Sequence, residues 1–275
     1  MPNLRGKVVF ITGAARGQGR AHAVRLAAEG VNVIVTDICA DIPAIPYPMA
    51  TVADLDETVA LVEKAGGRAV GYAADVRDRA ALEASHAAGL AAFDADHADI
   101  VVANAGGLAY PSDDIADGDA FKTSIDVMLL GVWHTLQVTT PAMVAAGVGG
   151  SVILTSSSAA LRGFVGGSAG ADGYTAAKAG VVGLMQVYAN LLGPHRIRVN
   201  SIHPTGVNTG MVQNEAFLRW MNAAQTAPIS GAHNTLPIDI LEAEDVSDAV
   251  AWLAGDGSRY VTGMALRIDA GFVNS

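Results

Sequence analysis

The chain has 275 residues, of which 51% are hydrophobic and 16% are charged, and its formal net charge is −10. This length fits one large α/β domain with a full core, or two small domains. The excess of negative charge argues against a nucleic-acid partner, because phosphates would be repelled. Cys39 is the single cysteine, so an internal disulfide is excluded and a cytoplasmic location is expected.

Membrane and metal binding are not expected either. Residues 1–7 lack the apolar stretch of a signal peptide, and no apolar run looks long enough to span a bilayer. The seven histidines show no metal-ligand spacing, so we expect no metal site.

Short runs rich in Val and Ile alternate with helical stretches along the chain. We expect strands at 8–12, 32–36, 69–73, 100–103, 151–155, 198–203 and 265–268, and helices at 17–29, 53–65, 78–92, 119–146, 174–192 and 244–254. Such nearly continuous apolar runs are typical of strands buried on both faces of a parallel sheet. The alternation predicts an α/β fold with a doubly wound, parallel seven-stranded sheet, in a single domain over residues 1–275.

Two stretches interrupt this alternation. Residues 38–50, which we call the insert, contain Pro43, Pro46 and Pro48, and these exclude a helix or a central strand. Residues 211–241, rich in Asn, Ala, Gly and Pro, are expected to form one or two short helices and a mobile flap over the substrate. Both follow strands at their carboxyl ends, where ligands bind in open α/β sheets.

A glycine-rich turn follows the first strand. Its sequence is Thr12-Gly13-Ala14-Ala15-Arg16-Gly17-Gln18-Gly19. Such a turn directs backbone N–H groups at a pyrophosphate, and its glycines remove Cβ atoms where the ligand approaches. Asp37 ends the second strand about twenty residues later, where a carboxylate accepts from a ribose hydroxyl and repels the 2′-phosphate of NADP. The pattern predicts an NAD site; the alternative is a purely structural turn.

Tyr174 and Lys178 carry the strongest catalytic signal. They are spaced four residues apart, so they share one face of the helix expected to begin at Tyr174. A nearby ammonium lowers the pKa of a phenol from about 10, which makes the phenol usable as an acid or base. A strand ending in the hydroxyls of residues 155–158 precedes them. The alternative is a surface Tyr/Lys pair.

The T-G-x-x-x-G-x-G spacing and the Ser…Tyr-x-x-x-Lys pattern resemble the short-chain dehydrogenase/reductase family over nearly the whole chain, Leu4 to Phe272. The resemblance implies a Rossmann fold, a homotetramer, and a catalytic set of Ser157, Tyr174 and Lys178. Ser156 and Ser158 remain alternatives to Ser157, because a Gly-rich stretch, 163–173, lengthens the usual interval to the tyrosine.

The resemblance extends to the residues that hold the cofactor. Asn104-Ala105-Gly106 matches the family's N-A-G motif beside the nicotinamide ribose, and Asp75-Val76 matches its adenine-contacting pair. Without the resemblance, these would be an Asn-Gly turn and a helix N-cap. The residues assigned to NAD in this way are Gly13, Arg16, Gly17, Gln18, Gly19, Asp37, Ile38, Asp75, Val76, Asn104, Ala105, Gly106, Tyr174, Lys178, Pro204, Val207 and Thr209.

Met128 departs from the family pattern. It stands where the family has an asparagine that is thought to hold a water between the catalytic lysine and solvent. Methionine cannot donate a hydrogen bond. Three alternatives follow: another group holds the water, Asp126 does so, or proton transfer is impaired.

The insert resembles that of the carveol-dehydrogenase-like, mycofactocin-associated members of the family. Those members hold NAD tightly, and several are thought to pass electrons to an external redox carrier. We therefore expect NAD-dependent oxidation of a small apolar secondary alcohol, similar to a terpene alcohol, or the reverse reduction. The candidate walls of the substrate site are Leu108, Phe164, Met211, Phe217, Trp220 and Met221. The alternative is a catalytically weak or inactive NAD-binding sensor or scaffold, which Met128 alone supports.

Overall fold

Seven strands pair in parallel in the computed structural model, which describes residues 4–110, 116–163, 168–224 and 233–275. Their order in the sheet is β3-β2-β1-β4-β5-β6-β7, and the predicted doubly wound, parallel seven-stranded sheet is confirmed. The bounds are β1 (Val8–Thr12), β2 (Asn32–Asp37), β3 (Arg68–Ala73), β4 (Ile100–Ala103), β5 (Gly150–Thr155), β6 (Ile197–Pro204) and β7 (Ala265–Ile268). The order reverses between β1 and β4, and the crevice at such a reversal is where open α/β sheets bind ligands.

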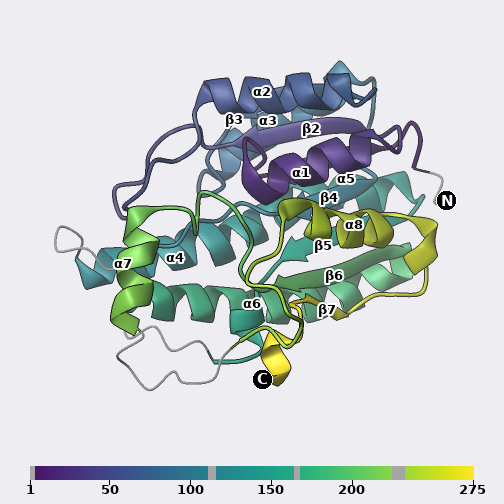
Figure 1. Cartoon of the computed structure of the whole chain (residues 1–275). Helices are drawn as coiled ribbons and strands as arrows, with labels where there is room; N and C mark the ends of the chain where they lie inside the picture. The colour runs from purple at the N-terminus through teal and green to yellow at the C-terminus, as the bar shows by residue number, and fades with distance from the viewer. Residues whose placement is uncertain (1–3, 111–115, 164–167, 225–232) are drawn as a thin grey trace.

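Helices cover both faces of this sheet (Figure 1). On one face lie α1 (Gly17–Ala27), α2 (Val52–Lys64) and α8 (Ala243–Ala254). On the other lie α3 (Arg79–Ala92), α4 (Asp117–Ile125), α5 (Gly131–Ala146) and α6 (Ala169–Leu192). A further helix, α7 (Glu215–Ala224), belongs to the predicted flap. The short helical turns are η1 (Asp126–Leu130), η2 (Ser158–Ala160), η3 (Gly193–His195), η4 (Asp256–Ser258) and η5 (Phe272–Asn274).

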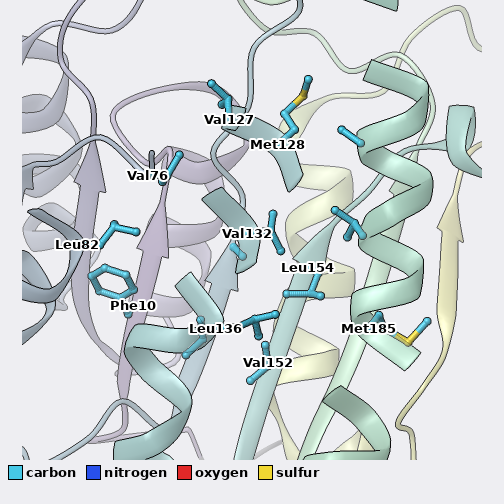
Figure 2. Packing of buried hydrophobic residues seen from close by; sticks show 14 of the residues in the cluster. Phe10, Val76, Leu82, Val127, Met128, Val132, Leu136, Val152, Leu154 and Met185 are labelled. Atoms are coloured by element: carbon cyan, nitrogen blue, oxygen red, sulfur yellow. The ribbon is translucent and has the colours of Figure 1, made fainter. Parts of the chain in front are cut away.

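The core consists of two apolar layers, one on each side of the sheet, because neighbouring residues of a strand point to opposite faces. Phe10 of β1 belongs to the layer beneath α3, α5 and α6, together with Leu82 and Leu136 (Figure 2). Val9 and Ile11 belong to the layer beneath α1, α2 and α8. The two edge strands, β3 and β7, depart from the expected burial on both faces, since β3 pairs with β2 alone and β7 with β6 alone.

The helix predicted at 174–192 begins five residues earlier, at Ala169. The sequence placed Gly170 and Gly173 in a Gly-rich stretch before the helix, yet both lie within α6, where the helix packs closely on its neighbours. A Cβ at Gly170 would lie 1.8 Å from the carbonyl oxygen of Ala109, and one at Gly173 would lie 2.8 Å from that of Phe121. Tyr174 therefore stands inside a formed helix, which fixes its direction.

The helix predicted at 119–146 is interrupted by the π-helical turn η1, which separates α4 from α5. The combined stretch, Asp117–Ala146, has the length and mean hydropathy of a membrane span, contrary to the expectation that no such run exists. Half of its most apolar window is buried within the protein. A core helix of a globular protein has the same properties, so this stretch is weak evidence for a membrane span.

Candidate active site

A cavity of about 820 Å³ lies at the carboxyl end of the sheet. It is lined by the β1–α1 turn, the insert, the segments after β3, β4, β5 and β6, and the beginning of α6. Every residue that the sequence assigns to catalysis or to NAD lines this one cavity, except Gly19. The fold thus brings together candidates that are spread over about 200 positions of the chain.

The glycines of the β1–α1 turn have little room around them. A Cβ at Gly13 would lie 2.5 Å from Cα of Ala105, and Gly13 and Gly17 have φ angles of +66° and +56° that favour glycine. Gly19 does not line the cavity, because it packs against the turn itself: its Cβ would lie 2.2 Å from the carbonyl oxygen of Gly13. Its role is therefore close helix–turn packing. The bare backbone beside the cavity suits a pyrophosphate.

The glycine-rich β1–α1 turn and the nearby Asp37 line the cavity together, and we call them the cofactor cradle. Asp37 is the buried carboxylate of this cradle. Its side chain is 8% exposed, and Oδ2 accepts a hydrogen bond of 2.9 Å from the backbone N–H of Ala15. Burial raises its pKa, although N–H groups of Ala15, Ile38 and Cys39 partly offset this by stabilising the carboxylate. Hydroxyl donors from a ribose would stabilise the charged form further. Oε1 of Gln18, also at the cavity, is buried without a partner among the described residues, which suits a polar ligand.

Arg16 connects the cradle to the insert. Its Nη2 donates a hydrogen bond of 2.7 Å to the carbonyl oxygen of Pro48. On the other side, its guanidinium lies so close to Gly210 that a Cβ there would be 3.4 Å from Cζ. Arg16 therefore lies between the insert and the segment that follows β6.

The remaining cofactor candidates have structural partners as well. Nδ2 of Asn104 donates to the carbonyl oxygen of Gly13 at 3.0 Å, so it ties the ends of β1 and β4 together. The carboxylate of Asp75 forms an ion pair with Arg77, with 2.6 Å between Oδ2 and Nη2. Sequence reasoning missed this ion pair. It engages the carboxylate that was expected to contact the adenine.

Ser157, Tyr174 and Lys178 meet at one end of the cavity. Oγ of Ser157 accepts a hydrogen bond of 3.1 Å from the N–H of Ala159, and the side chains of Ser157 and Tyr174 are also hydrogen-bonded. Nζ of Lys178 donates to the carbonyl oxygen of Thr155 at 2.7 Å. Ser156 points away from this set, because its Oγ donates to the carbonyl oxygen of Lys178. The geometry thus favours Ser157 over Ser156 as the partner of Tyr174.

The pKa of Tyr174 is raised in this arrangement, although the nearby lysine led us to expect a lowered value. Burial raises the pKa of Tyr174, and the hydrogen bond with Ser157 offsets only part of that effect. Burial also lowers the pKa of Lys178 to about 8. The ammonium lies 5.7 Å from the centre of the Tyr174 ring, and the loss of hydration outweighs its influence. Both groups are therefore driven toward their neutral forms.

His203 is a site residue that sequence reasoning missed. It is fully buried, with Nδ1 2.8 Å from the carbonyl oxygen of Ser157 and Nε2 2.8 Å from Oγ of Ser201. Because a carbonyl only accepts, Nδ1 carries the proton and Nε2 accepts from the Ser201 hydroxyl. His203 thereby fixes the backbone from which the Ser157 hydroxyl projects. The sequence showed only a histidine within an apolar strand.

Met128 is fully buried within η1, beside Val127 (Figure 2). It packs against the turn after β4: a Cβ at Gly106 would lie 3.6 Å from both its Cγ and its Sδ. The alternative that Asp126 replaces the family's asparagine is weakened, because the Asp126 carboxylate forms an ion pair with Lys122. A thioether, with a carboxylate held in an ion pair two residues earlier, thus stands where the family pattern has an amide.

We predict that Met128→Asn raises kcat or shifts the pH–rate profile, because an amide can anchor a water where a thioether cannot. An unpaired amide at this buried position would cost about 1–3 kcal/mol, so thermal unfolding must first show that the variant is folded. Met128→Leu is the matched control and should keep the wild-type profile. A folded Met128→Asn protein with an unchanged pH–rate profile would mean that the proton leaves by another route.

The predicted substrate walls lie at the same cavity, as far as the structure describes them. Leu108, Met211, Phe217 and Trp220 line it. Phe164 and the side chain of Met221 lie outside the described residues. Sequence reasoning missed Tyr110, whose ring lies 5.7 Å from those of both Phe217 and Trp220. These walls carry no charged side chain, so an apolar substrate suits them.

Residues 7–217 match the family model described as short chain dehydrogenase. The chain belongs to this family. It is 52% identical to an oxidoreductase of Mycobacterium tuberculosis, covering 98% of this chain and 97% of that protein. It is 45% identical to the (-)-trans-carveol dehydrogenase of Rhodococcus erythropolis, covering 98% and 99%. The crystal structure of a carveol dehydrogenase from Mycobacterium avium in complex with NAD superimposes with a TM-score of 0.90 at 43% identity, covering all of both chains. The predicted likeness to carveol dehydrogenases within the short-chain dehydrogenases is confirmed.

Proposed function

We propose that this short-chain dehydrogenase transfers a hydride between NAD and a small apolar secondary alcohol, or reduces the matching ketone. The observation that carries the proposal is the convergence of Ser157, Tyr174 and Lys178 on one cavity that also contains the glycine cradle and Asp37. Leu108, Met211, Phe217 and Trp220, none of them charged, line the same cavity, which suits a terpene-like or other cyclic alcohol. The relatives named carveol dehydrogenase support the same substrate class.

Each member of the catalytic set has a distinct role in this proposal. Tyr174 exchanges the proton of the substrate hydroxyl, and Ser157 orients the substrate oxygen through a hydrogen bond. Lys178 holds the nicotinamide ribose, and bound NAD supplies the hydride acceptor. Because the pKa of Tyr174 is raised, the phenol is protonated near neutrality, and it acts as an acid for ketone reduction there. Alcohol oxidation needs the phenolate and is favoured at higher pH.

A panel of secondary alcohols tests this function in the presence of an artificial electron acceptor. Turnover of compact cyclic alcohols and no turnover of charged or sugar alcohols is the expected pattern. Activity confined to charged substrates would contradict the proposal. The sensor or scaffold alternative gains no support from the site, since the catalytic set is assembled.

We expect NAD to bind at least about tenfold more tightly than NADP, because the Asp37 carboxylate repels a 2′-phosphate. The ratio of the dissociation constants of NADP and NAD is measured by titrating each cofactor into protein that has been freed of cofactor by unfolding and refolding. Asp37→Asn removes the charge with little change in volume and should bring this ratio closer to one. The control, Asp56→Asn on the exposed face of α2, should leave it unchanged. Equal or tighter NADP binding by the wild type would contradict the role of Asp37.

We further propose that the chain assembles as a homotetramer, as the family resemblance implies. Large apolar side chains are exposed on adjacent stretches of η1, α5 and α6, notably Leu130, Trp133, Val187 and Leu191. Exposed apolar groups of this kind on a helical face mark protein–protein contacts. A molecular mass in solution equal to one subunit would contradict the assembly.

A further inference from the structure

The insert reaches beyond the cofactor cradle to the loop after β4. A Cβ at Gly107 would lie 2.5 Å from Cδ1 of Ile45, so the insert packs directly on this loop. Oη of Tyr47 accepts a hydrogen bond of 3.0 Å from the backbone N–H of Leu108. Ile45 and Tyr47 are only 5% and 8% exposed. This part of the insert is therefore anchored next to a predicted wall of the substrate site.

A continuous aromatic cluster connects the insert to α7. The Tyr47 ring lies 6.0 Å from the Tyr110 ring, and Tyr110 in turn contacts Phe217 and Trp220 of α7, each at 5.7 Å. The Tyr110 hydroxyl donates a hydrogen bond of 2.6 Å to the carbonyl oxygen of Met211. Aromatic contacts at such distances stabilise a fixed arrangement. The insert, the β4 loop and α7 thus form one wall.

This wall belongs to the same cavity as the reacting groups, since Tyr47, Tyr110 and Tyr174 all line it. Burial raises the pKa of Tyr47 to about 12, and the charge of a Tyr174 phenolate raises it as well.

We propose that Tyr47 determines substrate specificity: its ring forms part of the wall of the substrate chamber, limits the room beside it and favours compact cyclic alcohols over elongated ones. This inference rests on the proposed function, and it gives the insert a second role beside that of covering NAD. The hydrogen bond to Leu108 holds the ring in place, and the contact with Tyr110 couples it to α7.

The test compares cyclohexanol with 4-tert-butylcyclohexanol, which is extended opposite the carbinol. We expect Tyr47→Ala to shift the ratio of their kcat/KM values at least about tenfold toward the longer alcohol, the effect of opening an apolar pocket by a whole side chain. Tyr47→Phe keeps the ring and should shift the ratio less than about threefold. The matched control is Met49→Ala in the same insert. Met49 follows Pro48, whose carbonyl oxygen accepts the hydrogen bond from Arg16 on the cofactor side of the insert. Truncating Met49 should therefore leave the ratio of the two kcat/KM values unchanged, even if NAD exchanges faster.

Binding is measured independently of turnover. Trp220 belongs to the wall, so in NAD-loaded Tyr174→Phe protein that also carries Trp133→Phe and Trp252→Phe, quenching of its fluorescence reports the binding of each alcohol without turnover. Affinity for the longer alcohol should rise relative to cyclohexanol in Tyr47→Ala. An unchanged ratio in Tyr47→Ala, or an equal shift in Met49→Ala, would overturn the role of Tyr47 and leave the proposed function intact. A wild-type protein that neither binds nor oxidises either alcohol would overturn both.

Discussion

Tyr174→Phe should lower kcat by about 10²–10⁴-fold, the usual contribution of a general acid or base. The substitution removes one hydroxyl and little volume, so bound NAD should be retained. Turnover of the best alcohol, with an artificial acceptor present, measures the loss. The wild-type rate of oxidation should rise with pH, because burial raises the pKa of Tyr174 and the phenolate forms only at higher pH.

The matched control for this prediction is Tyr260→Phe, because that side chain is 89% exposed and distant from the cavity. It should show wild-type kinetics. A Tyr174→Phe protein that keeps more than about a tenth of the wild-type kcat would mean that another group exchanges the proton.

Replacing residues 40–50 by a short Gly-Ser link should speed the exchange of NAD by at least about tenfold, because differences in affinity between related complexes lie mainly in the dissociation rate. The replacement removes the Arg16–Pro48 hydrogen bond and takes the buried side chains Ile42 and Tyr47 out of the cavity wall. Labelled NAD, added to protein as purified, measures the exchange. We also expect the wild type to retain NAD on purification and to need an artificial acceptor for steady turnover.

Thermal unfolding must show that the shortened protein is folded, since the lost residues contribute to the core. Wild-type protein that is purified without NAD, or that exchanges it as fast as the shortened variant, would rule out retention by the insert. It would also remove the reason to expect an external redox carrier.

The strands could be predicted because buried parallel strands leave apolar runs in the sequence. The insert was predicted as irregular because its prolines exclude regular structure, and the structure has no helix or strand over 38–50. The beginning of α6 could not be predicted, since glycines normally weaken a helix and only the contact with Ala109 explains Gly170.

The site residues that belong to local sequence motifs were predicted. Those whose role depends on contacts between distant parts of the chain were missed. Tyr174 and Lys178 are spaced by one helical turn, which the sequence shows directly. The hydrogen bond between His203 and Ser157 joins residues far apart in the chain, as does the contact between Tyr47 and Tyr110. The direction of the Tyr174 pKa shift was also missed, because residue spacing reveals the lysine but not the loss of hydration.

The most direct test of the account is the fate of the carbinol hydrogen. NAD-loaded protein is mixed with cyclohexanol that carries deuterium at the carbinol carbon. After a single turnover the cofactor is extracted, and the mass of its nicotinamide is measured by mass spectrometry. The account predicts deuterium in the nicotinamide ring of the wild-type sample and almost none in Tyr174→Phe. Cyclohexanone formed without deuterium in the nicotinamide, or no ketone from any secondary alcohol, would contradict it.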